Sequence, residues 1–196
     1  MSAEPGRATE AGRAPVPGRQ ASQHERLGRL VLVALLFALA LTLQWIEALL
    51  PPIPAPVPLK FGLSNIAVMY ALFFLGGRDA YQLAVLKSGF VLLTRSVLPA
   101  AFSLAGGLLS VTVMLLLHRL SRGRISWLLL SVSGAITHNL GQFLVLQLLY
   151  RSVSILWVAP LLLVAGVAAG VLSAVLLRLL LPALGRLRLP WGQGPS

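Results

Sequence analysis

The segment 126–150 restricts the possible folds most, because it is apolar and long enough to cross a lipid bilayer. A transmembrane helix needs roughly 20 predominantly apolar residues. An unpaired polar group in hydrocarbon costs on the order of several kcal/mol. The polar residues near the middle of the segment must therefore contact protein or a water-filled cavity. Those residues are Thr137, His138, Asn139 and Gln142.

A helical geometry brings part of this polar group together. His138 and Gln142 are four residues apart, so they share one face if the segment is a helix. Ser131, Gly134 and Gly141 fall close to the same stripe. Two interpretations fit this pattern: the side chains join neighbouring helices through hydrogen bonds, or they line a ligand pocket.

The composition indicates an integral membrane protein. Of the 196 residues, 57% are hydrophobic and 11% are charged, whereas a soluble domain carries about 25% charged residues. Three of the five acidic residues precede residue 26, which leaves Glu47 and Asp79 for the membrane part. Two carboxylates are too few for the acid cluster that a magnesium–diphosphate site requires.

Neither a cofactor nor a nucleic acid is indicated as a partner. The chain has no cysteine and its three histidines are scattered, so no metal site is predicted. No P-loop, dinucleotide, GxSxG or HExxH motif occurs, and we expect no cofactor. The net charge of +11 comes from Lys and Arg at the ends of apolar segments, where they set topology. A basic stripe with interleaved aromatic residues, as nucleic-acid binding would require, is not seen.

Three regions follow one another along the chain. Residues 1–27 are rich in Ala, Gly, Pro and Arg and are predicted to be a disordered cytoplasmic tail. Residues 28–185 are predicted to form a six-helix transmembrane domain, and 186–196 a flexible cytoplasmic C-terminus. The expected fold class is an all-α integral membrane protein with spans at about 30–49, 60–75, 80–97, 100–117, 126–150 and 155–181.

The distribution of positive charge predicts the orientation. With six spans both termini share one side, and that side holds 12 of the 16 Lys and Arg residues. By the positive-inside rule this side is the cytoplasm of a plasma-membrane protein. The proline-rich connector 51–58 then faces outward, as either a plain connector or a lid.

Four further polar residues mark candidate ligand contacts. Lys87 lies near the middle of its span, so it must face a cavity or an acid. Lys60 and Asn65 lie where a helix begins; they either attract an anion or snorkel to the surface and cap the helix. Glu47, near the end of the first span, is either an inward-facing group or a solvated acid.

Pairs of small residues predict close helix contacts. Ala34 and Ala38 are one turn apart and make a groove that another helix can approach. Gly166 and Gly170 form a GxxxG pair whose expected role is packing.

Three segments carry a resemblance to a known family: 60–66 (KFGLSNI), 103–110 (SLAGGLLS) and 134–142 (GAITHNLGQ). In these segments, and over about residues 30–182, the chain resembles heptaprenyl diphosphate synthase component I proteins, also called Gx transporter proteins. That family is similar to the S components of energy-coupling factor (ECF) transporters. S components are six-helix proteins that bind a small molecule near the outer surface, while a transmembrane T subunit and two ATPases drive uptake.

The resemblance implies a transporter subunit with a pocket and a partner surface. The small-molecule ligand would contact Glu47, Lys60, Asn65, Lys87, His138, Asn139 and Gln142. Ala34 and Ala38 match the first-helix face that meets the T subunit in S components.

A second hypothesis follows from the family name: a non-catalytic membrane subunit that docks a soluble prenyl diphosphate synthase through the basic loop 119–124, in isoprenoid or quinone biosynthesis. Autonomous catalysis is not expected, because the chain has a single aspartate and such synthases hold magnesium with aspartate-rich motifs.

Overall fold

The computed structural model describes residues 17–49, 62–122, 124–149 and 155–186, and these residues form six helices. The all-α fold class predicted from the sequence is confirmed. The helices are α1 (Pro17–Leu49), α2 (Asn65–Phe74), α3 (Gly77–Thr94), α4 (Val97–Leu120), α5 (Trp127–Leu149) and α6 (Ile155–Arg186).

Four of the helices are long and apolar enough to cross a membrane: α1 from Arg26 onward, α4, α5 and α6. These identify a multi-pass membrane protein. The other two helices differ from the predicted spans. With 10 residues, α2 rises about 15 Å at 1.5 Å per residue, which is roughly half of the hydrocarbon thickness. Helix α3 has 18 residues but carries Arg78, Asp79 and Lys87.

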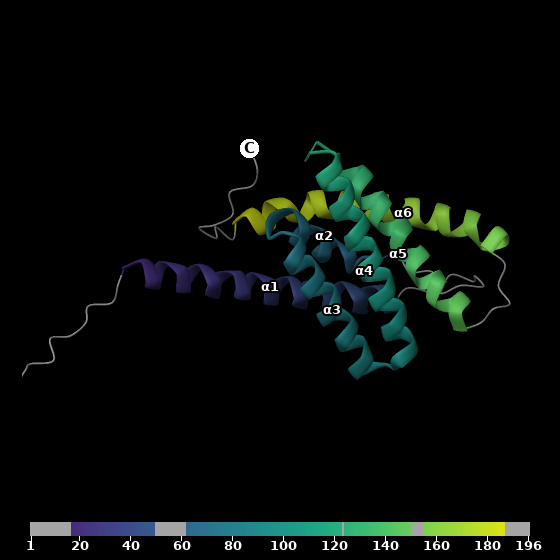
Figure 1. Ribbon diagram of the computed structural model, residues 1–196, viewed down its shortest axis with the longest axis horizontal. Helices are drawn as coiled ribbons and strands as arrows, with labels where there is room; N and C mark the ends of the chain where they lie inside the picture. The colour runs from purple at the N-terminus through teal and green to yellow at the C-terminus, as the bar shows by residue number, and fades with distance from the viewer. Residues whose placement is uncertain (1–16, 50–61, 123, 150–154, 187–196) are drawn as a thin grey trace, which may run out of the picture.

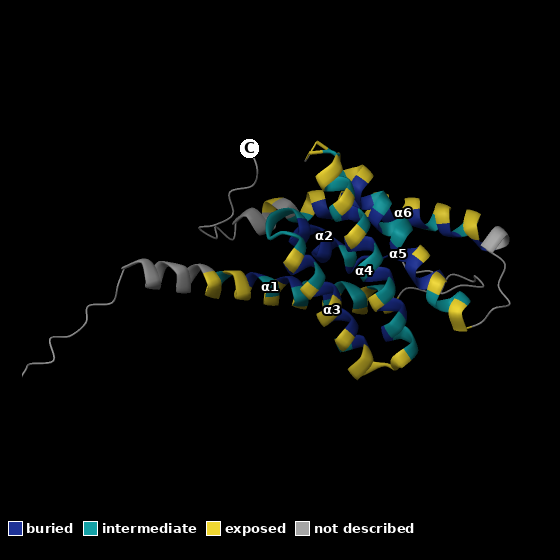
Figure 2. Ribbon diagram, viewed as in Figure 1, coloured by how far each residue is buried: buried dark blue, intermediate teal, exposed yellow. Residues whose placement is uncertain are grey.

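The helices pack as two groups, α1–α3 and α4–α6, which meet mainly through α3 and α4. Helix α5 packs between α4 and α6, while α1 packs against α2 and α3. Figure 1 shows α1 as a long rod at the edge of the bundle, with its first turns projecting beyond the other helices. The buried residues gather where the helices cross, and the exposed residues face outward (Figure 2). The outward residues include many large apolar side chains, as expected for a surface that meets lipid.

The first helix begins earlier than the sequence suggests. We predicted a disordered tail as far as residue 27, but α1 starts at Pro17. Proline is favoured in the first turn of a helix because its missing N–H has no partner there and its φ is already helical. The residues that follow, Gln20 to Arg26, include good helix formers. The segment before residue 27 is therefore partly helical although its sequence has no apolar period.

An ion pair joins α1 to the beginning of α3. Arg29 Nε donates to Asp79 Oδ2 over 2.8 Å, and its Nη2 donates to the carbonyl oxygen of Leu75 over 3.0 Å. Asp79 is buried, whereas the Arg29 side chain is 50% exposed. The pair fixes α1 against the turn between α2 and α3.

Replacing Asp79 with asparagine should lower the free energy of unfolding by about 1–2 kcal/mol. A hydrogen bond to a charged group contributes roughly 1.5–3 kcal/mol, and half-exposed Arg29 recovers part of this by turning to water. Thermal unfolding in detergent measures the effect. An Arg119→Gln variant, which changes an exposed arginine, is the control, and equal melting of the two variants would contradict the assigned role of the pair.

Candidate functional site

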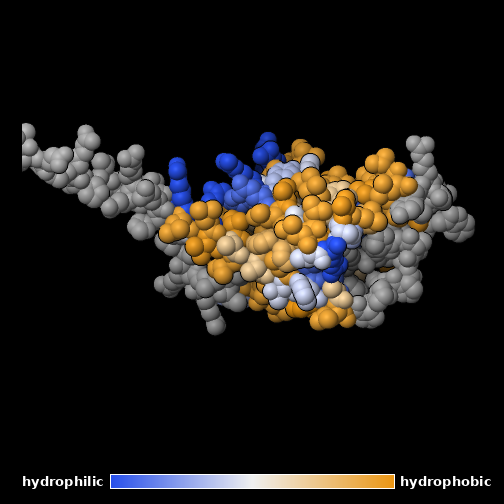
Figure 3. Space-filling view, turned by 90° about the horizontal axis from the view of Figure 1, so that it is seen from below, coloured by the Kyte–Doolittle hydropathy of each residue, from blue (hydrophilic) through white to orange (hydrophobic). Residues whose placement is uncertain are grey.

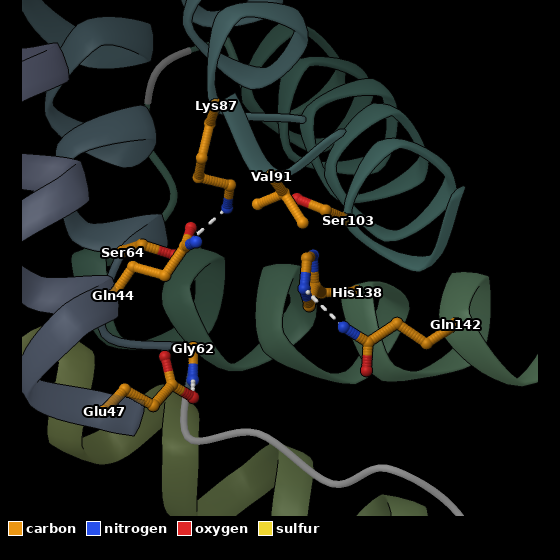
Figure 4. A pocket seen from close by; sticks show the side chains of 9 residues that line it. All are labelled: Gln44, Glu47, Gly62, Ser64, Lys87, Val91, Ser103, His138 and Gln142. Atoms are coloured by element: carbon orange, nitrogen blue, oxygen red, sulfur yellow. Dashed lines mark hydrogen bonds between the residues drawn. The ribbon is translucent and has the colours of Figure 1, made fainter. Parts of the chain in front are cut away.

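Side chains from five parts of the chain converge on one small cavity (Figure 4). They come from α1, the turn before α2, α3, α4 and α5. The cavity has a volume of about 20 Å³, which is room for about one water molecule. Its lining is Gln44, Glu47, Gly62, Ser64, Lys87, Val91, Ser103, His138 and Gln142.

A turn at Gly62 brings the end of α1 to the start of α2. Gly62 has φ +70°, a left-handed backbone conformation in which a residue with a Cβ is strained. This turn directs the Gly62 N–H toward Glu47, whose Oε1 accepts it over 2.8 Å, and the Gly62 carbonyl accepts from Asn65 N. The glycine of the KFGLSNI motif therefore has a conformational role, and Glu47 contacts protein at the edge of the cavity.

Lys87 extends from the middle of α3 into this cavity. Its side chain is only 2% exposed, and its Nζ donates to Ser64 Oγ and Asn65 Oδ1, each over 3.1 Å. Two of the residues at the start of α2 are thus partners of one buried ammonium group. A charge so far from water requires such partners, because desolvation disfavours the charged form.

His138 and Gln142 form a second polar pair, on the α5 side of the cavity. Helix α5 begins after Ser126, whose Oγ accepts a hydrogen bond from Leu129 N and so caps the helix. Further along α5, Gln142 Nε2 lies 3.1 Å from His138 Nε2. With the amide in this orientation its nitrogen donates and His138 Nε2 accepts.

A glycine of α4 makes room for this imidazole. A Cβ built on Gly106 would lie 2.8 Å from both Nδ1 and the carbonyl oxygen of His138. The ring therefore lies directly against the α4 backbone. One turn earlier on α4, Ser103 lines the cavity, and its Oγ is hydrogen-bonded to Ser88 Oγ of α3 over 3.2 Å.

The structure brings together four of the seven predicted ligand-contact residues: Glu47, Lys87, His138 and Gln142 line the same cavity. A fifth, Asn65, does not line the cavity but accepts a hydrogen bond from Lys87, which does. Lys60 lies outside the described residues. The four lining residues come from three helices, α1, α3 and α5, so tertiary packing brings them together.

Asn139 does not line the cavity. It lies seven residues after Val132 and four before Phe143, so it shares their face of α5. Both neighbours contact α6: Val132 lies against Gly170, and Phe143 packs with Val158 and Leu162. Asn139 is 2% exposed, and its Nδ2 has no hydrogen-bond partner among the described residues. The face of α5 that carries Asn139 is therefore the one that packs on α6.

Five lining residues were not among the predicted ligand contacts. Two of them could have been predicted from helical spacing. Val91 is one turn after Lys87 on α3, and the polar Gln44 is about one turn before Glu47 on α1. Ser64 precedes Asn65, and Ser103 is the first residue of the segment 103–110 that carried the family resemblance. Gly62 has no side chain from which a lining role could be inferred.

The arrangement suits hydrogen bonding of a small polar molecule more than metal binding. Within one cavity it offers an ammonium group, an imidazole, two amides and a carboxylate. In the described part of the chain no three His, Asp or Glu residues are close enough to hold a metal ion. Seven of the nine lining residues have polar side chains, so the cavity suits a polar guest more than an apolar one.

Comparison with known proteins identifies one family. Residues 36–180 match the model of a family described as heptaprenyl diphosphate synthase component I. No curated protein and no solved structure matches the chain. The matched range contains every described residue that lines the cavity.

Proposed function

We propose a function from the premise that the chain belongs to the heptaprenyl diphosphate synthase component I family. The chain is the membrane-embedded, substrate-binding subunit of an ECF-type uptake transporter for a small organic metabolite. One observation carries this proposal: Lys87, His138, Gln142 and Glu47 meet at a cavity inside a bundle of membrane-spanning helices. The chain has no catalytic role of its own in this proposal.

The burial of these groups supports a binding role. Ionisable residues inside membrane proteins are costly and mark solute pathways more often than surface positions do. Lys87 is 2% exposed and His138 4%. Helix packing alone would be satisfied by small and apolar residues at the same positions, as at the α5–α6 contact of Gly170 with Val132.

The cavity is in a closed state. A volume of about 20 Å³ is far below the roughly 300 Å³ of the smaller ligand pockets, so a metabolite enters only when the lining separates. We place the opening at the end of α1, because that helix packs on α2 and α3 at the bundle edge. There Gly62 N donates a hydrogen bond to Glu47 at the edge of the cavity, and breaking such a bond to a charged group costs roughly 1.5–3 kcal/mol.

The ligand takes over hydrogen bonds that the closed state makes internally. Lys87 would leave Ser64 and Asn65 to bind an anionic or strongly accepting group. Gln142 and His138 would separate and orient a second polar group. Exchanging partners keeps the Lys87 ammonium group and the Gln142 amide hydrogen-bonded, which avoids the penalty of leaving those two groups unpaired.

The T subunit is proposed to bind α1. Ala34 and Ala38 are both exposed, as is Thr42 one turn further, so a row of small residues faces away from the bundle. Close approach of a partner helix needs such a row. In the proposed orientation both termini are cytoplasmic in the plasma membrane, and the end of α1 with Glu47 lies toward the outside.

Replacing Gln142 with leucine should release the ligand. Protein purified in mild detergent from a cell extract is expected to retain a small molecule, identified by mass spectrometry. Leucine keeps much of the side-chain volume of glutamine but removes the amide group, so the amount of small molecule retained should fall at least tenfold. Gln147→Leu is the matched control, because it makes the same change on α5 outside the cavity lining. Equal retention by the two variants would refute this site.

The family name favours a second candidate, docking of a soluble prenyl diphosphate synthase. Arg119, Arg122 and Arg124 are all exposed at the α4–α5 connection and would form the docking surface. Changing the three to glutamine should lower synthase activity in membranes and leave solute uptake unchanged. Gln142→Leu should have the opposite pattern, so the two functions are distinguishable.

A further inference from the structure

A second hollow lies at the other end of α1, where α1 meets the beginning of α3. Its volume is about 360 Å³, and it is open to the surface. Its lining includes three arginines, Arg26, Arg29 and Arg78, together with Asp79. Leu30 and Val33 of α1 are the apolar residues of the lining. We call this hollow the arginine groove.

The groove has more positive charge than its single acid balances. Arg29 is held by Asp79 and the Leu75 carbonyl, so these two side chains neutralise each other. Arg26 and Arg78 are exposed and make no ion pair with another described residue. The first backbone N–H groups of α3, which begins at Gly77, add the positive end of a helix dipole. An anion in the groove therefore meets two uncommitted guanidinium groups.

Membrane depth restricts what the anion is. Arg26 is the first residue of the membrane-spanning part of α1, so the groove lies where lipid headgroups meet hydrocarbon. Leu27 and Leu30 are 61% and 66% exposed, and both continue the apolar side of α1. Apolar residues cover most of the described surface in Figure 3, while strongly hydrophilic residues project along one edge and form a smaller group within that face.

We propose that the arginine groove binds the phosphate or diphosphate headgroup of a membrane amphiphile. Arg26 and Arg78 hold the headgroup, since guanidinium groups bind phosphate oxygens in a bidentate manner. The hydrocarbon chain of the amphiphile lies along Leu30 and Val33. This site is separate from the cavity at Lys87 and does not depend on the transported solute.

The experiment compares two double variants of the full chain in a neutral detergent. Arg26→Gln/Arg78→Gln removes the two uncommitted charges, and Arg122→Gln/Arg124→Gln removes the same charge from an exposed loop elsewhere. Native mass spectrometry measures binding of phosphatidylglycerol, with phosphatidylcholine as the zwitterionic reference. We expect the first variant to bind phosphatidylglycerol at least tenfold more weakly than the second. Equal binding by the two variants, or no preference for the anionic lipid, would overturn the proposal.

Two further probes separate the sources of the headgroup. If farnesyl diphosphate displaces phosphatidylglycerol, the occupant is a prenyl diphosphate. If farnesyl diphosphate does not displace phosphatidylglycerol, the occupant is a phospholipid. Both results support an amphiphile. Inorganic diphosphate should bind at least tenfold more weakly than farnesyl diphosphate, because it lacks the chain that contacts Leu30 and Val33. Equal affinity for these two probes would contradict the amphiphile. Thermal unfolding verifies that both variants are folded.

Discussion

Replacing Lys87 with methionine should abolish ligand binding and uptake while leaving the bundle folded. Methionine has a similar length but no charge, so the ligand loses its ammonium partner, and we expect at least a hundredfold loss of affinity. Stability follows a different balance. Ser64 Oγ and Asn65 Oδ1 each lose a hydrogen bond, which costs about 1–3 kcal/mol per group. Removing a buried charge returns a desolvation cost of several kcal/mol.

The expected combination is thus a lost function with a melting temperature close to that of the wild type. Isothermal titration with the identified ligand and thermal unfolding measure the two effects separately. Leu86→Met, at an exposed position of the same helix, serves as the matched control. If Lys87→Met binds the ligand normally, Lys87 is not a ligand contact. If it fails to fold, its role is to join α3 to α2.

Replacing Gly141 with alanine should destabilise the bundle by about 1–3 kcal/mol, the usual cost of forcing extra volume into a packed contact. A Cβ at Gly141 would lie 2.8 Å from both Ala105 O and Gly106 Cα of α4. Backbone atoms cannot rotate away as a side chain does, so α4 and α5 must separate. Separation also moves His138 away from Gly106, and ligand affinity should fall with stability.

Gly89→Ala provides the comparison, because no heavy atom lies within 4 Å of a Cβ at Gly89 of α3. Alanine is favoured over glycine inside a helix by up to about 1 kcal/mol, so this variant should be neutral or more stable. Unfolding titrations in mixed detergent measure both. If the two variants have equal stability, α4 and α5 do not pack through Gly141.

Part of the site could be read from local spacing. His138 and Gln142 are one turn apart, and the structure places both at the cavity, hydrogen-bonded to each other. Lys87 was identified by its position in the middle of an apolar segment, and it is buried there. Both predictions rest on short-range rules, the periodicity of a helix and the cost of charge in hydrocarbon.

Helical spacing did not identify the cavity residues correctly on α5, where two different faces of the helix carry polar side chains. Asn139 follows His138 directly, so the two are about 100° apart around α5. The sequence places both in a polar group but does not say which helix covers each face. Contacts with α6 on one side and α4 on the other separate Asn139 from the cavity.

By itself, the sequence determined that the chain is helical, that its helices belong in a membrane and that a few polar side chains must be kept from lipid. These properties depend on composition and on periodicity over one or two turns. Tertiary structure alone decided that Glu47 meets Gly62, that Lys87 meets Ser64, and that α2 is only 10 residues long. It also decided the size of the cavity. Such features depend on how far rigid helices can approach, and that distance is set by side chains remote in sequence.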